Sequence, residues 1–242
     1  MEDFIKKVED LYKRSLNKNI VTCTGFLTPA EKQTIITKLN YTNAVFLGGV
    51  KSAERVRVFF LPDYMEEIDI KDYVTAFCAN FSFKKLSHRD FLGALLSLGI
   101  ERRCRGDIYV FEKEAYFLVT NDIASYVKNN FDKVSNVGVK LKEVSLDEVV
   151  TIDPVFKEIV FSVSGLRLDS VVSGSINESR EKSNLLVKSG VVLLNYLVCE
   201  IPSKEVREGD IFSIKGYGKY VLKEIGGESR RGKIFVKVNK YI

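Results

Sequence analysis

The spacing of hydrophobic residues in the first 70 positions changes from a helical to an extended period. Apolar side chains recur every three to four positions over residues 4–16, which predicts an amphipathic helix. A second helix begins sharply, because Thr28 is a good N-cap, Pro29 suits the first helical position and Glu31 completes a capping box. The extended stretches that follow are NAVFLGG (43–49) and RVRVFFLP (55–62).

The next segment, residues 71–155, predicts the order strand, helix, strand, strand, helix, strand. The stretches are DYVTAFCANFSF (72–83), SHRDFLGALLSLG (87–99), GDIYVFEKEAYFLVT (106–120), NDIASYVKNNF (121–131) and VGVKLKEVSL (137–146). We expect Ser87 to cap the first helix, Gly99 to end it, and Asn121 to cap the second. This βαββαβ order is the split-βαβ arrangement of ferredoxin-like folds and RNA-recognition domains.

RNA-recognition domains bind through exposed aromatic side chains on the middle strands of their sheet. Here Tyr109 and Phe111 share one strand face and follow Arg105 and Gly106, which matches the usual pattern only in part. We therefore expect these two aromatic side chains to pack in the core rather than to stack on bases.

The last segment, residues 156–242, predicts a strand, two helices and then a small antiparallel sheet. We expect its second helix to start at Asn177 or Ser179 and to end at Gly190. The whole chain is thus expected to be an α+β protein in three parts. These parts are a small N-terminal α/β unit (1–70), a domain like an RNA-recognition motif (RRM-like, 71–155) and a C-terminal domain (156–242).

The composition argues against a metal centre, a membrane span and a secreted protein. The four cysteines are far apart and His88 is the only histidine, so neither a metal site nor a cofactor is expected. No apolar run approaches the roughly 18 residues that a membrane-spanning helix needs. The N-terminus mixes both signs of charge, unlike a signal peptide, so we expect a cytoplasmic protein without a membrane partner.

Positive charge is concentrated in the last third of the chain. Residues 1–164 contain 23 basic and 23 acidic side chains, whereas residues 165–242 contain 14 basic and 9 acidic ones. A small basic module behind a neutral body suits a polyanionic partner such as RNA.

Ordered motifs in this basic segment resemble the S4 (alpha-L) RNA-binding domain. The matching stretches are RLD (167–169), SREKSNLLVKSGVVLLN (179–195) and PSKEVREGDIFSIKGYGK (202–219). They place Arg-Leu-Asp at the start of the first helix and Ser-Arg at the start of the second. Two positions depart from the family pattern, because Asn184 stands where Arg is frequent and Tyr196 where Gly is frequent.

The two helix starts explain how such a domain holds phosphate groups, since their free N–H groups and positive dipole ends attract anions. Arg167 and Arg180 lie at these starts, and each guanidinium can grip a phosphate through two hydrogen bonds. We expect Asp169 to orient the arginines, and Leu185 and Leu186 to turn toward the core. The expected RNA-binding residues are Arg167, Arg180, Lys182, Ser183, Asn184, Lys188, Lys215 and Lys219, with no catalytic or metal-ligating residue.

The upstream two thirds of the chain resembles the YlmH family, bacterial proteins with a C-terminal S4 domain. The stretches that carry this resemblance are FLTPAE (26–31), FLGGVKSAERVRVFF (46–60) and LSHRDFLGALLSLGIERRCRGDIYV (86–110). The resemblance implies a non-enzymatic protein that binds rRNA of the large ribosomal subunit and/or peptidyl-tRNA in the rescue or quality control of stalled ribosomes. Arg167 and Arg180 match two arginines that contact rRNA or tRNA in small S4 proteins. We expect a monomer.

Two other functions stay open at this point. An RNA-modifying enzyme of the pseudouridine-synthase type would use an Asp such as Asp169, but only a few strands follow it, and no Gly-x-Gly-x-x-Gly or P-loop motif is present. The stretch GGESRRGK (226–233) is expected to form a basic hairpin turn instead. A cell-division adaptor would use the neutral first 164 residues as a protein-binding surface, and genes of the family commonly lie beside cell-division genes.

Overall fold

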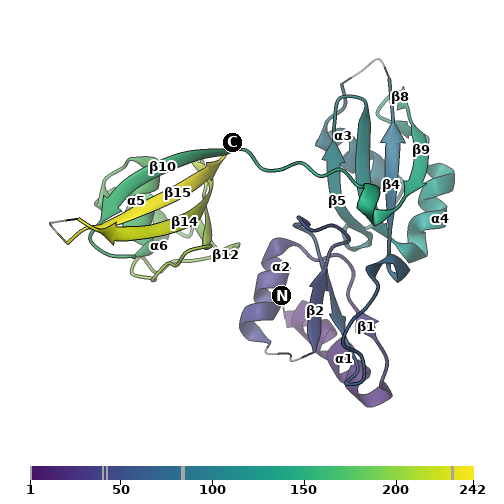
Figure 1. Cartoon of the computed structure of the whole chain (residues 1–242), viewed down its shortest axis with the longest axis horizontal. Helices are drawn as coiled ribbons and strands as arrows, with labels where there is room; N and C mark the ends of the chain where they lie inside the picture. Colours follow the sequence, from purple (N-terminus) through teal and green to yellow (C-terminus); the bar gives the residue numbers. More distant parts are fainter. Residues whose placement is uncertain (1, 40, 42, 83–84, 230–231) are drawn as a thin grey trace. The chain divides into compact units, whose positions relative to one another are not determined.

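The protein has an α+β fold that divides into two compact units, Met1–Asp153 and Pro154–Ile242 (Figure 1). The computed structural model describes residues 2–39, 41, 43–82, 85–229 and 232–242. Among these residues, no helix is long and apolar enough to cross a membrane. Each unit has its own hydrophobic core.

The N-terminal part of the first unit packs two helices on a small antiparallel sheet. Its elements are α1 (Glu2–Lys18), β1 (Thr22–Cys23), α2 (Pro29–Lys38), β2 (Ala44–Leu47) and β3 (Arg57–Phe60), with the strand order β1-β3-β2. The predicted capping box is confirmed: the amide of Thr28 donates to Oε2 of Glu31 at 2.7 Å, and the amide of Glu31 donates to Oγ1 of Thr28 at 3.3 Å. Val8, Ile35 and Phe60 meet in the core between the helices and the sheet.

The rest of the first unit has the predicted βαββαβ order. Its main elements are β4 (Val74–Asn80), α3 (His88–Ser97), β5 (Arg105–Val110), β6 (Glu114–Thr120), α4 (Asn121–Asn130) and β9 (Lys140–Val144). The antiparallel strand order is β5-β6-β4-β9. Each βαβ pair is thus split by one strand, as the sequence pattern predicts. Phe91 of α3 and Val127 of α4 pack with Phe77 and Phe117 of the sheet, so one sheet face is covered by both helices.

Two details of this domain differ from the sequence pattern. The N-cap of α4 is Thr120, not the predicted Asn121, because the Asn121 side chain accepts from Oγ1 of Thr75 at 2.6 Å and donates to the carbonyl of Lys71 at 3.0 Å. The predicted strand 137–146 is divided, since its first residues pair in a separate hairpin. The additional elements are β7 (Lys133–Val134), β8 (Val137–Gly138), and the 3-10 helices η1 (Ile70–Asp72), η2 (Arg102–Cys104) and η3 (Leu146–Glu148).

The second face of the sheet, which RNA-recognition domains use for stacking, is also covered. Tyr109 is 9% exposed and packs in a cluster with Phe26 from the N-terminal part and Leu146 from η3. A Cβ atom on Gly106 would lie 2.9 Å from the ring of Phe26, so these two surfaces are in close contact. Phe111 is partly buried against the same cluster. The expectation of core packing is confirmed for Tyr109, whereas Phe111 lies at the margin of the cluster and also lines a surface pocket.

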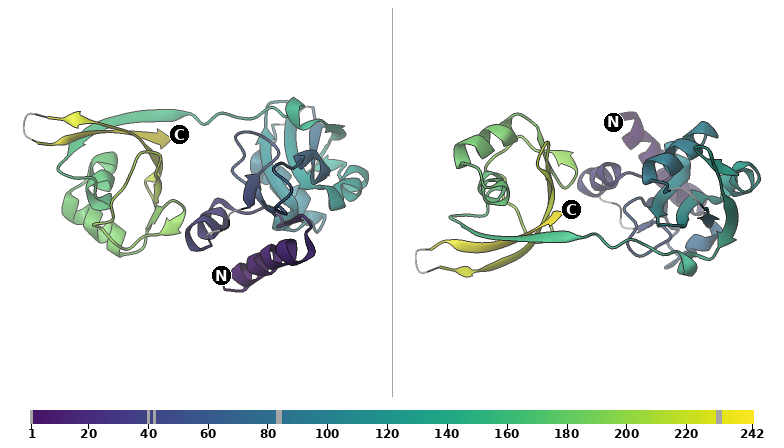
Figure 2. Two further views of the ribbon diagram at one scale, coloured as in Figure 1. Left: turned by 60° about the horizontal axis from the view of Figure 1, so that its bottom comes forward. Right: turned by 90° about the horizontal axis from the view of Figure 1, so that it is seen from above.

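The second unit packs two helices on a six-stranded antiparallel sheet (Figure 2). Its elements are β10 (Phe156–Val163), α5 (Leu168–Ile176), α6 (Arg180–Lys188), β11 (Val192–Leu194), β12 (Leu197–Val198), β13 (Ile211–Ile214), β14 (Gly218–Glu228) and β15 (Ile234–Tyr241). The strand order is β10-β15-β14-β13-β11-β12. β10 precedes the helices and pairs along its whole length with the final strand, β15. This pairing joins the N-terminal and C-terminal ends of the unit. The tip of the predicted basic hairpin, residues 230–231, lies outside the described residues.

The turns of the second unit follow from a few special positions. Ser179 caps α6, because its hydroxyl accepts a backbone N–H of the first turn at 3.2 Å, whereas Asn177 ends α5 in the left-handed conformation. Gly190 follows α6 with a φ of 71°, as predicted for the end of this helix. Asn195 and Tyr196 have φ values of 48° and 67° in the two-residue turn between β11 and β12. This conformation favours glycine, so Tyr196 is strained there.

Gly174 offers a test of the packing of α5 on the sheet. A Cβ atom at Gly174 would overlap the ring of Phe161 in β10. We expect Gly174→Ala to lower the free energy of unfolding of the second unit by on the order of 1–3 kcal/mol, despite the better helix propensity of alanine. Thermal denaturation followed by circular dichroism measures this change.

Gly93 in α3 is the matched control, because a Cβ atom there would meet no atom within 4 Å. Gly93→Ala should raise the free energy of unfolding of the first unit by up to about 1 kcal/mol. Unchanged or increased stability in Gly174→Ala would contradict the close contact of α5 with β10.

Candidate nucleic-acid interface

The predicted RNA-binding surface is centred on the buried carboxylate of Asp169. Arg167 is the N-cap of α5, so Asp169 lies in the first turn, where the helix dipole favours a negative charge. The chain after β12 crosses this helix end, and the amide of Leu168 donates to the carbonyl of Lys204 at 2.8 Å. The amide of Asp169 donates to the carbonyl of Pro202 at 3.0 Å. These contacts leave Asp169 only 2% exposed.

Two arginines and one asparagine converge on this carboxylate. Arg167 donates from Nε to Oδ1 of Asp169 at 3.1 Å and from Nη2 to Oδ2 at 3.0 Å, which is a bidentate pair. Arg180 places Nε 3.7 Å from Oδ2, and Asn184 donates from Nδ2 to the same oxygen at 3.5 Å. The side chains of Arg167 and Arg180 are 43% and 53% exposed. Asp169 therefore holds the guanidinium of Arg167 through two hydrogen bonds and attracts that of Arg180 through a longer ion pair, and about half of each side chain stays open to solvent.

The charges of this cluster stabilise one another. Burial acts to raise the pKa of Asp169, but hydrogen bonds from Arg167 and Asn184 and the charge of Arg180 outweigh it, so the pKa lies below its ordinary value. The hydrogen bond to Asp169 in turn raises the pKa of Arg167. Two guanidinium groups share one carboxylate, so the exposed side of the cluster is positive.

Two residues of α6 lie differently from their prediction. Ser183, expected at the RNA surface, is 0% exposed beside the buried Val187, so it cannot contact RNA in this structure. Its hydroxyl has no hydrogen-bond partner within the described part of the chain. Leu185, expected in the core, is 61% exposed, whereas Leu186 packs against the core as predicted. Because each helical residue turns by about 100°, Leu185 faces away from a core side that is centred on Ser183 and Val187.

The predicted lysines near the second helix have different surroundings. Lys182 forms an ion pair with Glu178 at 2.6 Å, and the hydroxyl of Tyr217 donates to the same carboxylate at 3.3 Å. The hydrogen bond to Glu178 raises the pKa of Lys182. Lys188 is exposed in the last turn of α6, and Lys215 is exposed directly after β13. Lys188 and Lys215 are therefore accessible to a ligand, whereas Lys182 already has a counter-charge.

Lys219 lies between two aromatic rings. Its ammonium group is 4.5 Å from the centre of the Tyr241 ring and 5.1 Å from that of Tyr196. Such contacts with ring faces are favourable for a cation. The departure of Tyr196 from the usual glycine is the one signal in the sequence that marks this position.

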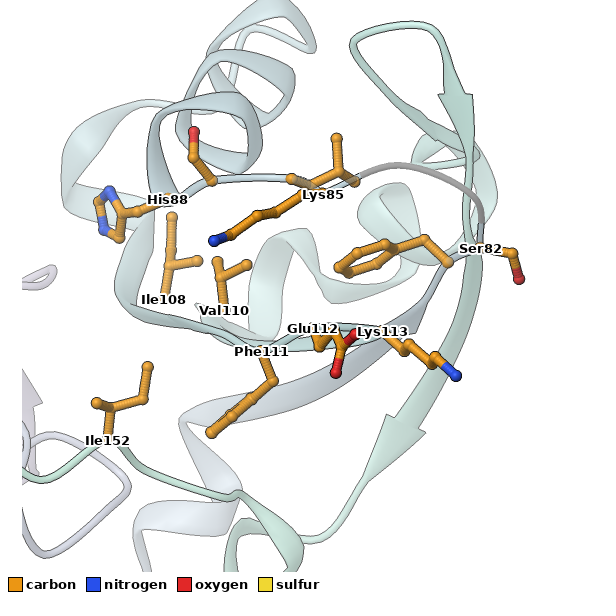
Figure 3. A pocket seen from close by; sticks show the side chains of 12 residues that line it. Ser82, Lys85, His88, Ile108, Val110, Phe111, Glu112, Lys113 and Ile152 are labelled. Carbon is orange, nitrogen blue, oxygen red and sulfur yellow. The ribbon is translucent and has the colours of Figure 1, made fainter.

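The first unit has a pocket of about 1070 Å³ beside β5, which is an edge strand of the sheet (Figure 3). Ile108 and Val110 of β5 form part of an apolar wall, and the side chain of Lys85 extends beside them. His88, at the start of α3, lies at the rim. Burial and the charge of Arg105 lower the pKa of His88. Within the described chain, no group of His, Cys, Asp and Glu side chains is arranged to hold a metal ion.

Comparisons with known proteins point to one family. Residues 1–65 match a family model described as "YlmH, N-terminal", and residues 69–148 match one described as "Putative RNA-binding domain in YlmH". The chain is 34% identical over 218 residues to "Ribosome-associated protein quality control protein P2" of Bacillus subtilis (strain 168), covering 87% of this chain and 83% of that protein. A solved structure, "Cell division protein ylmH from Streptococcus pneumoniae", is 25% identical with a TM-score of 0.47, covering 61% of this chain and 88% of that one.

The substitution Asp169→Asn tests the role of the buried carboxylate. Asparagine has the same shape but no charge, so the ion pairs with Arg167 and Arg180 are lost. We expect the free energy of unfolding of the second unit to fall by about 1–3 kcal/mol, as for other hydrogen bonds to charged groups. Denaturant unfolding measures the change. Asp147→Asn is the control, because Asp147 is 86% exposed and pairs with Lys71 only at the surface, where such pairs contribute roughly 0–1 kcal/mol.

The pH dependence of stability in the wild type and in Asp169→Asn gives a second test. The folded-state pKa of Asp169 lies below the ordinary value of 3.8. The stabilisation by its charge is therefore fully present above that value and is lost as the pH falls through the lower folded-state pKa. The stability difference between the wild type and Asp169→Asn should be constant near neutral pH and shrink below about pH 4. A difference that grows on acidification would contradict the charge pairing.

Proposed function

Because the chain belongs to the YlmH family, we propose that it is a non-enzymatic RNA-binding protein that associates with the ribosome. The family model for the middle domain is described as RNA-binding, and the Bacillus subtilis relative is named for ribosome-associated protein quality control. The role that we propose is the rescue or quality control of stalled ribosomes. Its partners there are rRNA of the large ribosomal subunit and/or peptidyl-tRNA, and the protein acts as a cytoplasmic monomer.

The observation that carries this proposal is the pair of guanidinium groups held by Asp169. Arg167 and Arg180 belong to the starts of two different helices, and one carboxylate keeps both in place before a ligand arrives. A planar guanidinium donates two parallel hydrogen bonds to a phosphate, and less ordering on binding means higher affinity. The second unit thus acts as an S4 RNA-binding domain, with Lys188 and Lys215 as further phosphate contacts.

An enzymatic role of the Arg-Leu-Asp motif is disfavoured by the surroundings of Asp169. A catalytic carboxylate has to reach the reacting group of its substrate. Asp169 is 2% exposed, and both of its oxygens accept hydrogen bonds from Arg167. Its geometry is that of a positioning group for the arginines.

The double change Arg167→Ala with Arg180→Ala tests this function. We expect it to weaken co-sedimentation with large ribosomal subunits by on the order of tenfold to 100-fold, because two phosphate contacts are lost. The slope of log affinity against log salt should fall by about 1.4–1.8, since each contact contributes roughly 0.7–0.9.

A double change that removes the same charge elsewhere in the second unit serves as control. Lys157 is exposed, and Lys223 is an exposed partner of Glu158 at 3.7 Å. Lys157→Ala with Lys223→Ala should change the affinity much less. Equal losses in the two double variants would point to general electrostatic attraction and refute the assignment of Arg167 and Arg180.

A further inference from the structure

The sheet face through which RRM-like domains stack bases is covered here by Phe26 and Leu146. A contact between this domain and RNA therefore has to use another part of the surface. The start of β5, directly after η2, gathers three arginines, of which the sequence pattern singled out only Arg105, beside Gly106. They are Arg55, Arg102 and Arg105.

Arg55 holds this arginine cluster together. Its Nη2 donates to the carbonyl of Arg102 at 2.8 Å and to that of Phe26 at 3.2 Å, and its Nε donates to the carbonyl of Arg105 at 3.1 Å. These acceptors are neutral backbone groups, so they position the guanidinium without cancelling its charge. Arg55 thereby ties the η2 segment to the N-terminal part of the unit.

Arg105 is buried in a way that is unusual for a cation. It is 7% exposed, and its Nε is buried without a hydrogen-bond partner in the described chain. Burial lowers the pKa of Arg105, and the charges of Arg55 and Arg102 lower it further, while Asp107 acts in the opposite direction. A buried cation close to two other cations is unfavourable unless an anion compensates it.

Asp107 is the acidic side chain whose charge acts on both Arg55 and Arg105. Asp107 accepts the backbone N–H of Glu54 at 2.8 Å and that of Arg55 at 3.2 Å. Burial raises the pKa of Asp107, and the nearby Glu54 acts in the same direction. Glu31, whose charge acts on Arg55, belongs to the capping box of α2. Asp107 acts on both Arg55 and Arg105, so it offsets only part of the charge of the three arginines.

We propose that Arg102 and Arg105, positioned by Arg55, bind a phosphate group of RNA at this edge of the middle domain. This inference rests on the proposed RNA-binding function and adds a second contact to it. Arg102 is exposed and meets the ligand first, whereas Arg105 supplies donors in a partly dehydrated setting, where charge-assisted hydrogen bonds are strong. RNA suits the site better than an acidic peptide, because the family model that matches residues 69–148 is described as an RNA-binding domain.

Two neighbouring arginines provide a matched test in the full chain. Arg102→Ala removes a member of the cluster, whereas Arg103→Ala removes a charge from the same 3-10 helix. The side chain of Arg103 is 70% exposed and pairs with Glu101 at 2.7 Å. The probe is fluorescein-labelled, fragmented ribosomal RNA in an anisotropy titration. Arg102→Ala should weaken binding several-fold and reduce the salt slope by about 0.7–0.9, while Arg103→Ala should leave the slope unchanged.

His88 provides a second, independent measurement. It is the only histidine in the sequence. Burial lowers its pKa, the charge of Arg105 lowers it further and that of Asp107 acts in the opposite direction, so its NMR titration responds to charge at the cluster. Sodium sulfate, as a substitute for a phosphate group, should raise the pKa of His88 relative to sodium chloride at equal ionic strength. The rise should persist in Arg103→Ala and be smaller in Arg102→Ala.

Equal RNA affinities and salt slopes for Arg102→Ala and Arg103→Ala would overturn the inference, as would a pKa of His88 that does not respond to sulfate. Weaker binding of Arg102→Ala to ribosomal subunits, with unchanged binding to RNA, would instead indicate a protein partner and overturn the assignment to RNA. If only the Arg167 and Arg180 double variant loses RNA binding, the inference fails and the proposed function stands. If none of these variants loses RNA binding, both fail.

Discussion

The pairing of the buried carboxylate of Asp169 with two arginines is the interaction on which the second unit depends. Removing a carboxylate from water costs several kcal/mol unless cations and hydrogen bonds replace the lost hydration. Arg167 provides a bidentate contact and Arg180 a longer ion pair, so both must stay near the starts of their helices. The same requirement brings α5 and α6 together at one end and concentrates positive charge there.

The local elements were predictable because short-range chemistry determines them. The capping boxes at Thr28 and Ser87, the cap at Ser179 and the left-handed Gly190 all lie where residue type and hydrophobic period place them. The βαββαβ order also follows from the periods alone. The prediction of Asn121 as an N-cap was wrong for a tertiary reason. Its side chain suits an N-cap, but it forms hydrogen bonds with Thr75 and Lys71 on neighbouring segments.

The sequence predicts the two main arginines of the candidate site, but it does not predict which side chains of α6 are buried. Helical spacing places Ser183, Asn184 and Lys188 on related faces of α6, but it does not give the direction of the core. That direction depends on how α6 packs against α5 and the sheet, and it buries Ser183 while leaving Leu185 exposed. The hydrogen bond from Asn184 to Asp169 likewise joins two helices, so no local pattern encodes it. Arg105 is a similar case, since its low exposure and the bond from Arg55 to its carbonyl depend on tertiary packing rather than on a local pattern.

The first unit illustrates why a strand order does not by itself assign a binding mode. The sheet has the topology of an RNA-recognition domain, yet Phe26 occupies the face on which bases would stack. Gly106 makes this contact possible, because any Cβ atom at that position would be forced against the ring. Covering the face stabilises the contact between the two parts of the unit and removes the aromatic platform. The positive groups at the start of β5 remain, and they suit the phosphate backbone rather than the bases, as do the helix-start arginines of the second unit.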